Sequence, residues 1–94
     1  MELSELRNEI DEIDQELVRL FCQRMQVSAK VADYKKAAGS PIYHPQREQE
    51  ILKQVARMAG PELEVYAKEL YSRIFELSRS YQSKRLESST EVRE

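Results

Sequence analysis

One uninterrupted helical pattern constrains the fold of this chain more than any other stretch of its sequence. Apolar side chains recur in steps of three and four from Leu3 to Ala38, with no glycine or proline between them, and this spacing predicts a single helix. Ser4 is the predicted N-cap, and the Gly-Ser-Pro sequence after Ala38 supplies a stop signal. The members of the apolar stripe are Leu3, Leu6, Ile10, Ile13, Leu17, Leu20, Val27, Val31, Tyr34 and Ala38.

The length of this helix exceeds what a compact single chain can accommodate. About 35 residues at a rise of about 1.5 Å each give roughly 52 Å. A compact chain of 94 residues would have a radius of gyration of about 12 Å and a width of only about 32 Å. The apolar stripe runs the whole length of the helix, so the apolar side chains in the part that extends beyond a compact fold must also be shielded from water. A second copy of the chain is the simplest cover, and we predict a homodimer in which the long helices pair.

Two shorter helices follow, and glycine and proline mark the boundary between them. Pro45 suits the first position of the second helix, with His44 as a weak cap. A Gly-Pro pair directly after Ala59 ends this helix and allows a restart. The third helix is predicted to begin near Glu62 and to end at Leu86, because apolar side chains recur at helical spacing between these residues.

The sequence contains no strand pattern and no internal repeat. We therefore predict an all-α fold, with one very long and two shorter helices that form an intertwined homodimer. Residues 1–86 are the predicted domain. The tail 87–94 is polar and has no periodic apolar positions beyond Val92, so we predict that it is disordered.

The composition argues against several classes of function. Charged residues make up 34% of the chain and balance to a net charge of −2, which gives no general attraction to nucleic acid or to an anionic membrane. The single cysteine, Cys22, cannot form an intramolecular disulfide, and no pair of cysteine or histidine residues suggests a metal site. No signal peptide or membrane-spanning run is visible. We expect a cytoplasmic protein without a bound metal.

A cation interrupts the apolar stripe of the long helix. Arg24 occupies a stripe position, and a charge among apolar side chains is unfavourable unless an anionic group meets it. Lys35 follows after a net rotation of only about 20°, so the two cations share a face and lie roughly 16 Å apart. Ser28 and Val31 lie between them on this face. Both long side chains can therefore converge on one small molecule.

The other two helices carry polar groups where apolar ones are expected. Ser78 and Gln82 are spaced i,i+4 on one face of the third helix. Arg47 and Glu48 lie in the first turn of the second helix, where backbone amides are also free to bind a ligand. A pocket with these cations and hydrogen-bond donors would suit a small polyanion, such as a dicarboxylate.

Each of these residues also has a purely structural explanation. Arg24 could set the register of a coiled coil, and Lys35 could be a solvated base at a helix end. The polar residues of the other two helices could be ordinary boundary and first-turn groups. The convergence of polar residues from three helices favours the pocket over these separate explanations.

Arg7 lies too far from the other cations to serve the same pocket within one chain. It precedes Arg24 by about 25 Å along the helix axis and is turned about 100° from its face. In an antiparallel pair of long helices, however, the start of one helix can lie beside the middle of the other. A pocket that uses Arg7 would then be shared between two chains.

At this point the sequence resembles a known family, the all-helical AroQ-type chorismate mutases. The resemblance rests on L-R-N-E-I-D-E-I-D-Q-E-L-V-R-L-F-C-Q-R, on V-A-D-Y-K-K with P-Q-R-E-Q-E-I-L, and on Y-S-R-I-F-E-L-S-R-S-Y-Q. It covers roughly residues 3–86. The ordered set of Arg, Arg, Lys, Arg-Glu and Ser-x-x-x-Gln is its specific part, since the first motif alone is only an amphipathic helix.

The resemblance implies a role in substrate binding for each of the polar residues above. Arg7 of the partner chain and Arg24 would each bind a substrate carboxylate, and Ser78 would help to hold one. Lys35 and Gln82 would donate to the ether oxygen whose bond breaks.

The second helix and its cap complete the implied site. Glu48 would accept a hydrogen bond from the ring hydroxyl of the substrate, with Arg47 beside it. His44 stands where the family often has an acid, and that position mainly offers its backbone to the ring hydroxyl. The resemblance implies a monofunctional enzyme, because 94 residues leave no room for the dehydratase or dehydrogenase domains fused to some members.

The implied reaction explains which functional groups the sequence lacks. The conversion of chorismate to prephenate is a pericyclic rearrangement and needs no nucleophile, metal, cofactor or general base. The protein must hold a flexible dianion in its reactive conformer and stabilise the negative charge that develops on the ether oxygen. Two rival functions stay open: an isochorismate pyruvate-lyase on the same scaffold, and a non-catalytic helical dimerisation module.

Overall fold

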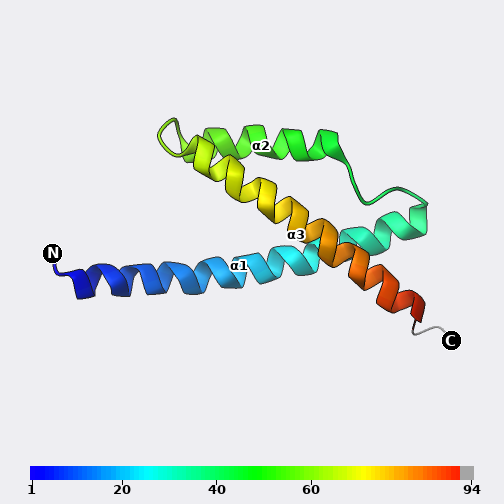
Figure 1. Cartoon of the computed structure of the whole chain (residues 1–94), viewed down its shortest axis with the longest axis horizontal. Coiled ribbons are helices and arrows are strands. Elements are labelled where there is room, and N and C mark those ends of the chain that lie inside the picture. Colours follow the sequence, from blue (N-terminus) through cyan, green and yellow to red (C-terminus); the bar gives the residue numbers. More distant parts are fainter. Residues whose placement is uncertain (92–94) are drawn as a thin grey trace.

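The computed structural model describes the backbone of residues 1–91 and the side chains of residues 1–87. It contains three helices: α1, Leu3–Ala38; α2, Pro45–Ala59; and α3, Glu64–Glu91 (Figure 1). No strand occurs among residues 1–91. The prediction of an all-α fold with one very long and two shorter helices is confirmed.

The ends of α1 differ in how their backbone groups are satisfied. The helix starts at Leu3 with Glu2 in an extended conformation as N-cap and no side-chain capping bond. The predicted N-cap, Ser4, is therefore wrong: it is already helical, because the amide of Leu6 bonds to the carbonyl of Glu2, at 3.2 Å. At the other end, Gly39 has φ 73°, a left-handed conformation that glycine adopts without a steric penalty.

α2 begins where the proline predicts. Pro45 occupies its first turn, and His44 Nδ1 accepts a hydrogen bond of 3.1 Å from the backbone amide of Arg47. This bond satisfies one of the free amides of the first turn, so the predicted cap at His44 is confirmed. Gly60, with φ 84°, ends the helix.

The bounds of α3 differ from the prediction at both ends. A turn closed by a bond of 3.2 Å from the Leu63 amide to the Gly60 carbonyl delays the start to Glu64. The helix continues past Leu86 to Glu91, because no glycine or proline follows Pro61 to stop it. The domain boundary at residue 86 stays a prediction. Of the tail predicted to be disordered, residues 92–94 lie outside the described part of the chain.

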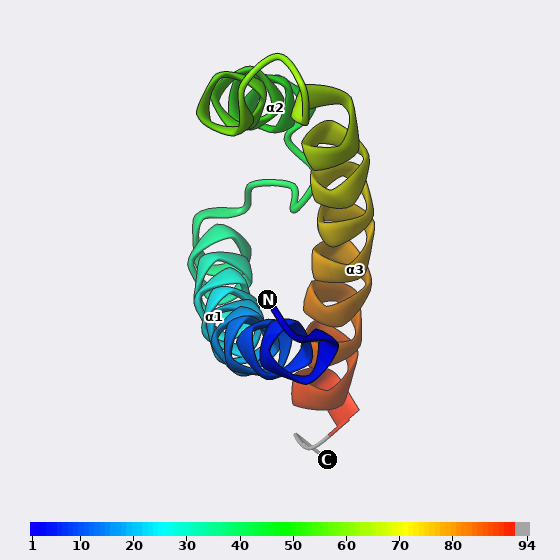
Figure 2. The ribbon, with the colours of Figure 1, turned by 90° about the vertical axis from the view of Figure 1, so that its left-hand side faces the viewer.

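α3 holds the other two helices together. It runs antiparallel to α2 and contacts it along its first half, and it crosses the second half of α1 with its own second half (Figure 1). Seen end-on, α1 and α2 lie apart and α3 spans the distance between them (Figure 2). None of the helices within residues 1–91 is long and apolar enough to cross a lipid bilayer.

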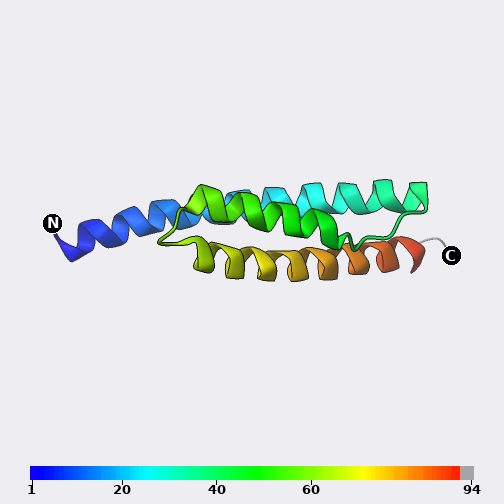
Figure 3. The ribbon, with the colours of Figure 1, turned by 90° about the horizontal axis from the view of Figure 1, so that it is seen from above.

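The first half of α1, residues 3–20, lies away from α2 and α3, and its start projects beyond both of them (Figures 1 and 3). We call residues 3–20 the projecting half of α1. The chain measures 59 × 29 × 14 Å, with a radius of gyration of 16.9 Å, against about 12 Å for a compact chain of this length. The apolar side chains of the projecting half are exposed, with Ile13 at 58% as an example. The buried apolar residues of the described chain lie elsewhere and are few: Ala29, Ala32, Val55 and Phe75.

Candidate active site

Arg24 lies at the crossing of α1 and α3, enclosed by groups from α3. Its guanidinium donates to Ser78 Oγ at 3.4 Å. Its Cζ atom lies 5.7 Å from the ring centroids of both Tyr71 and Phe75, which is within the range of cation–π attraction. These contacts offset the cost of a cation in the apolar stripe and hold the guanidinium in one place.

Ser78 and Gln82 are the buried polar residues of this crossing, and each is 7% exposed. Gln82 Nε2 donates to the carbonyl of Ser28 at 2.8 Å, and the Ser78 hydroxyl donates to Met25 Sδ at 3.5 Å. An amide nitrogen carries two donors, so the bond to Ser28 orients Gln82 and leaves its second N–H for another acceptor.

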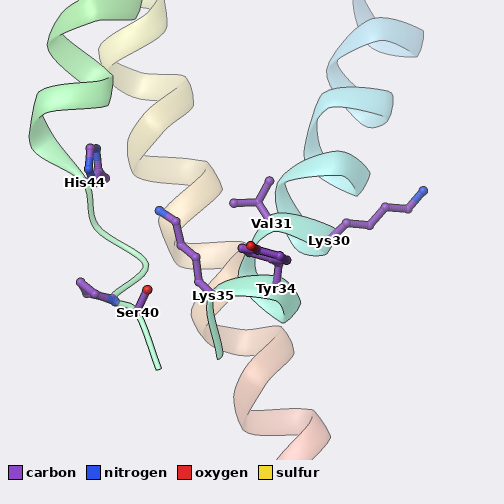
Figure 4. A pocket seen from close by; sticks show the side chains of 7 residues that line it. Lys30, Val31, Tyr34, Lys35, Ser40 and His44 are labelled. Carbon is purple, nitrogen blue, oxygen red and sulfur yellow. The ribbon is translucent and has the colours of Figure 1, made fainter. Parts of the chain in front are cut away.

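Lys35 links α1 to the connection that leads to α2. Its Nζ donates to the carbonyl of Ile42 at 3.1 Å. Beside it is a cavity of about 450 Å³, formed by the last turns of α1 and the connection. Figure 4 shows Lys35 extending toward the side of His44, while the end of Lys30 points away from the other labelled side chains. The cavity is lined by Lys30, Val31, Tyr34, Lys35, Ser40, Pro41 and His44.

Glu48 has a partner that the sequence did not predict. The guanidinium of Arg79, on α3, donates to the Glu48 carboxylate and forms an ion pair with it. The hydrogen bond to Glu48 raises the pKa of Arg79 above its usual value. Arg79 follows the buried Phe75 by one helical turn, and this i,i+4 relation was the signal that could have placed it on the inner face.

The remaining two predicted site residues stand apart from this group. Arg47 forms an ion pair of 3.6 Å with Glu50 on the exposed surface of α2. Arg7 is exposed near the start of α1, so the structure does not bring it to Arg24 within one chain. This placement agrees with the separation calculated from helix geometry.

The group as a whole is rich in cations and hydrogen-bond donors. Its members lie in separate contacts: Arg24, Ser78 and Gln82 at the crossing of α1 and α3, Lys35 at the connection, and Glu48 paired with Arg79. The cavity beside Lys35 is lined by none of Arg24, Glu48, Ser78 and Gln82. Such a set suits a small anion with two acidic groups and a hydroxyl. Within the described residues, no three His, Cys, Asp or Glu side chains are grouped as metal ligands would be.

Comparison with known proteins identifies relatives of this chain. The family model described as chorismate mutase type II matches residues 6–83. A bifunctional chorismate mutase/prephenate dehydratase of Aquifex aeolicus is 38% identical over 74 residues, or 79% of this chain and 18% of that protein. A T-protein of Haemophilus influenzae is 46% identical over 46 residues, or 49% of this chain and 12% of that protein.

A shorter relative is also similar. A chorismate mutase of Methanocaldococcus jannaschii is 36% identical over 56 residues, which are 60% of this chain and 57% of that protein. The chain thus spans less than a fifth of the first two relatives and little more than half of the third. No solved structure gives a significant match.

Proposed function

The chain belongs to the type II chorismate mutase family, and on this premise we propose that it catalyses the rearrangement of chorismate to prephenate in the biosynthesis of aromatic amino acids. One observation carries the proposal. Arg24, Ser78 and Gln82 lie together at the crossing of α1 and α3, each held by a hydrogen bond, inside the segment that matches the family.

Binding of the dianion begins with Arg24 in this proposal. Its guanidinium is already held by Ser78 and the two aromatic rings, so little side-chain entropy is lost when it binds a carboxylate. Ser78 lies within reach of the same carboxylate. Fixing both ends of a flexible substrate favours the folded conformer in which the bond-forming carbon atoms approach each other.

Lys35 and Gln82 are the proposed donors to the ether oxygen. The ammonium group has three N–H donors, and the bond to the Ile42 carbonyl uses one of them. Gln82 keeps its second N–H. Negative charge develops on the ether oxygen as its bond to carbon breaks, so these donors bind the transition state more strongly than the substrate.

The ring hydroxyl of the substrate is assigned to Glu48. A carboxylate accepts at about four lone-pair positions, so the pairing with Arg79 leaves room for a hydroxyl donor. Arg47, next to Glu48 in sequence, pairs with Glu50 on the surface in the single chain and is proposed as a further cation only when substrate is bound. The backbone of His44 is a second group for the hydroxyl. We propose no cofactor and no metal, because a pericyclic rearrangement calls for neither.

The functional unit that we propose is a homodimer with shared active sites. Support comes from the apolar side chains of the projecting half of α1, which a single chain leaves exposed. In an antiparallel pair, Arg7 of one chain would reach the Arg24 group of the other and bind the second carboxylate. We place the protein in the cytoplasm, as its charged composition and single cysteine suggest.

The test is an assay of the purified chain with chorismate and, separately, with isochorismate. We expect the ultraviolet absorbance of chorismate to fall and prephenate to accumulate, with no cleavage of isochorismate. Release of pyruvate from isochorismate alone would assign the chain to the lyase reaction instead. If neither substrate is consumed at micromolar protein, the pocket is not catalytic and a dimerisation module is the better explanation.

A further inference from the structure

Arg79 joins three segments of the chain that meet at the candidate site. It projects from α3, it pairs with Glu48 in the first turn of α2, and its Cζ atom lies 4.7 Å from the ring centroid of Tyr43 in the connection before α2. The function proposed above gives Arg79 no part. Its position against Glu48 raises the question of what the pairing does for the substrate.

The ion pair of Arg79 and Glu48 is less exposed than the surface pairs on the same helices. The two side chains are 33% and 22% exposed, whereas those of Arg73 and Glu76 on α3 are 65% and 56% exposed. Partial exclusion of water strengthens a charge pair, and an exposed pair is worth little. The Arg79 pair is therefore the one that can hold a carboxylate in a fixed orientation.

The chemistry of the guanidinium explains why arginine suits this position. Its Cζ atom lies over the Tyr43 ring, and one of its N–H groups donates to the Glu48 carboxylate. A lysine ammonium is a point donor and cannot stack and direct a carboxylate in the same way. With Arg79 in place, the Glu48 carboxylate loses rotational freedom.

We propose that Arg79 is a positioning residue that holds the Glu48 carboxylate ready to accept the ring hydroxyl of the substrate. The inference rests on the proposed function, in which Glu48 contacts that hydroxyl. The hydroxyl does not take part in bond breaking, so its hydrogen bond is about equally strong in the bound substrate and in the transition state. Loss of Arg79 should therefore raise KM and leave kcat nearly unchanged.

The experiment compares Arg79→Gln with the wild-type chain and with Arg73→Gln, a matched control on an exposed surface of α3. We expect Arg79→Gln to raise KM for chorismate about tenfold, with kcat within about twofold, as befits one hydrogen bond to a charged group. Arg79→Lys should recover only part of the loss. Arg73→Gln should behave as the wild type in both constants. Circular dichroism and thermal unfolding check that each variant is folded.

A chorismate analogue with hydrogen in place of the ring hydroxyl separates positioning from direct binding. Used as a competitive inhibitor, it should bind the wild-type chain and Arg79→Gln equally, within about twofold. A weaker inhibition of Arg79→Gln would mean that Arg79 contacts the substrate itself, and would overturn the inference. So would an unchanged KM for chorismate in Arg79→Gln. If the wild-type chain does not convert chorismate, the proposed function fails and the inference fails with it.

Discussion

At the scale of single residues, Arg24 illustrates how a charge is accommodated in an apolar stripe. The rings of Tyr71 and Phe75 and the hydroxyl of Ser78 surround it, and none of these groups is anionic. Its positive charge is thus stabilised by polarisable and neutral groups and is not neutralised. A carboxylate that enters beside it would meet a full unit charge, which an internal ion pair would have cancelled.

Lys35 gives the most direct test of the proposed chemistry. Lys35→Ala should lower kcat about a hundred- to thousand-fold, as removal of one donor to a developing oxyanion typically does. Lys36→Ala is the control, since Lys36 is exposed and adjacent in sequence. It should keep kcat within about twofold. Steady-state kinetics on folded protein measure both, and comparable losses in the two variants would contradict the assignment.

Several residues of the candidate site could be predicted from the sequence because helix periodicity fixes which side chains share a face. The pairing of Arg24 with Ser78 and the burial of Gln82 agree with that geometry. The i,i+4 relation to Phe75 could have placed Arg79 on the inner face of α3, but it could not identify the group that Arg79 contacts. Its partner Glu48 lies on another helix, and one sequence holds no information on that contact.

At the scale of elements, the positions of glycine and proline residues decide where helices begin and end. The end of α1 and both ends of α2 follow from residues with special backbone preferences, Gly39, Pro45 and Gly60. Prediction failed where such residues are lacking. Ser4 does not cap α1, because the helix begins two residues earlier than predicted and the Leu6 amide bonds to the Glu2 carbonyl. Nothing in the sequence stops α3 at Leu86.

Gly39 offers a test of this interpretation of the helix end. Its φ of 73° is left-handed, and a Cβ added there would meet no atom within 4 Å. Gly39→Ala should therefore destabilise the protein by about 1 kcal/mol through backbone conformation alone. Gly39→Asn should cost less, because asparagine tolerates this conformation. Urea unfolding at one fixed protein concentration measures both, and an equal loss for Asn and Ala would argue against the conformational cause.

At the scale of the whole molecule, the single chain is thin for its length. It measures 14 Å along its shortest axis, with α1 and α2 on one side and α3 on the other (Figure 3). Each helix therefore has few neighbours within one chain, which accounts for the small number of buried apolar residues in the described part. Two such chains, packed face to face, would bury more apolar surface.

Two variants test the dimer, and each places one carboxylate on a different face of the projecting half of α1. Ile13→Glu puts a carboxylate in the exposed apolar stripe, whereas Gln15→Glu puts the same group about 200° around the helix. We expect Ile13→Glu to have the 11.1 kDa mass of one chain and to lose chorismate turnover. Gln15→Glu should keep twice that mass and full activity. A monomeric wild-type chain with full activity would refute the dimer.

The projecting half of α1 has a consequence for genetics. In the proposed dimer, the two ends of one helix serve two different active sites, because Arg7 belongs to the site built on the Arg24 of the other chain. A cell that carries one allele lacking Arg7 and another lacking Arg24 would form mixed dimers with one intact site and one doubly defective site. If the alleles pair at random, about a quarter of all sites would be intact, and two null alleles would complement each other.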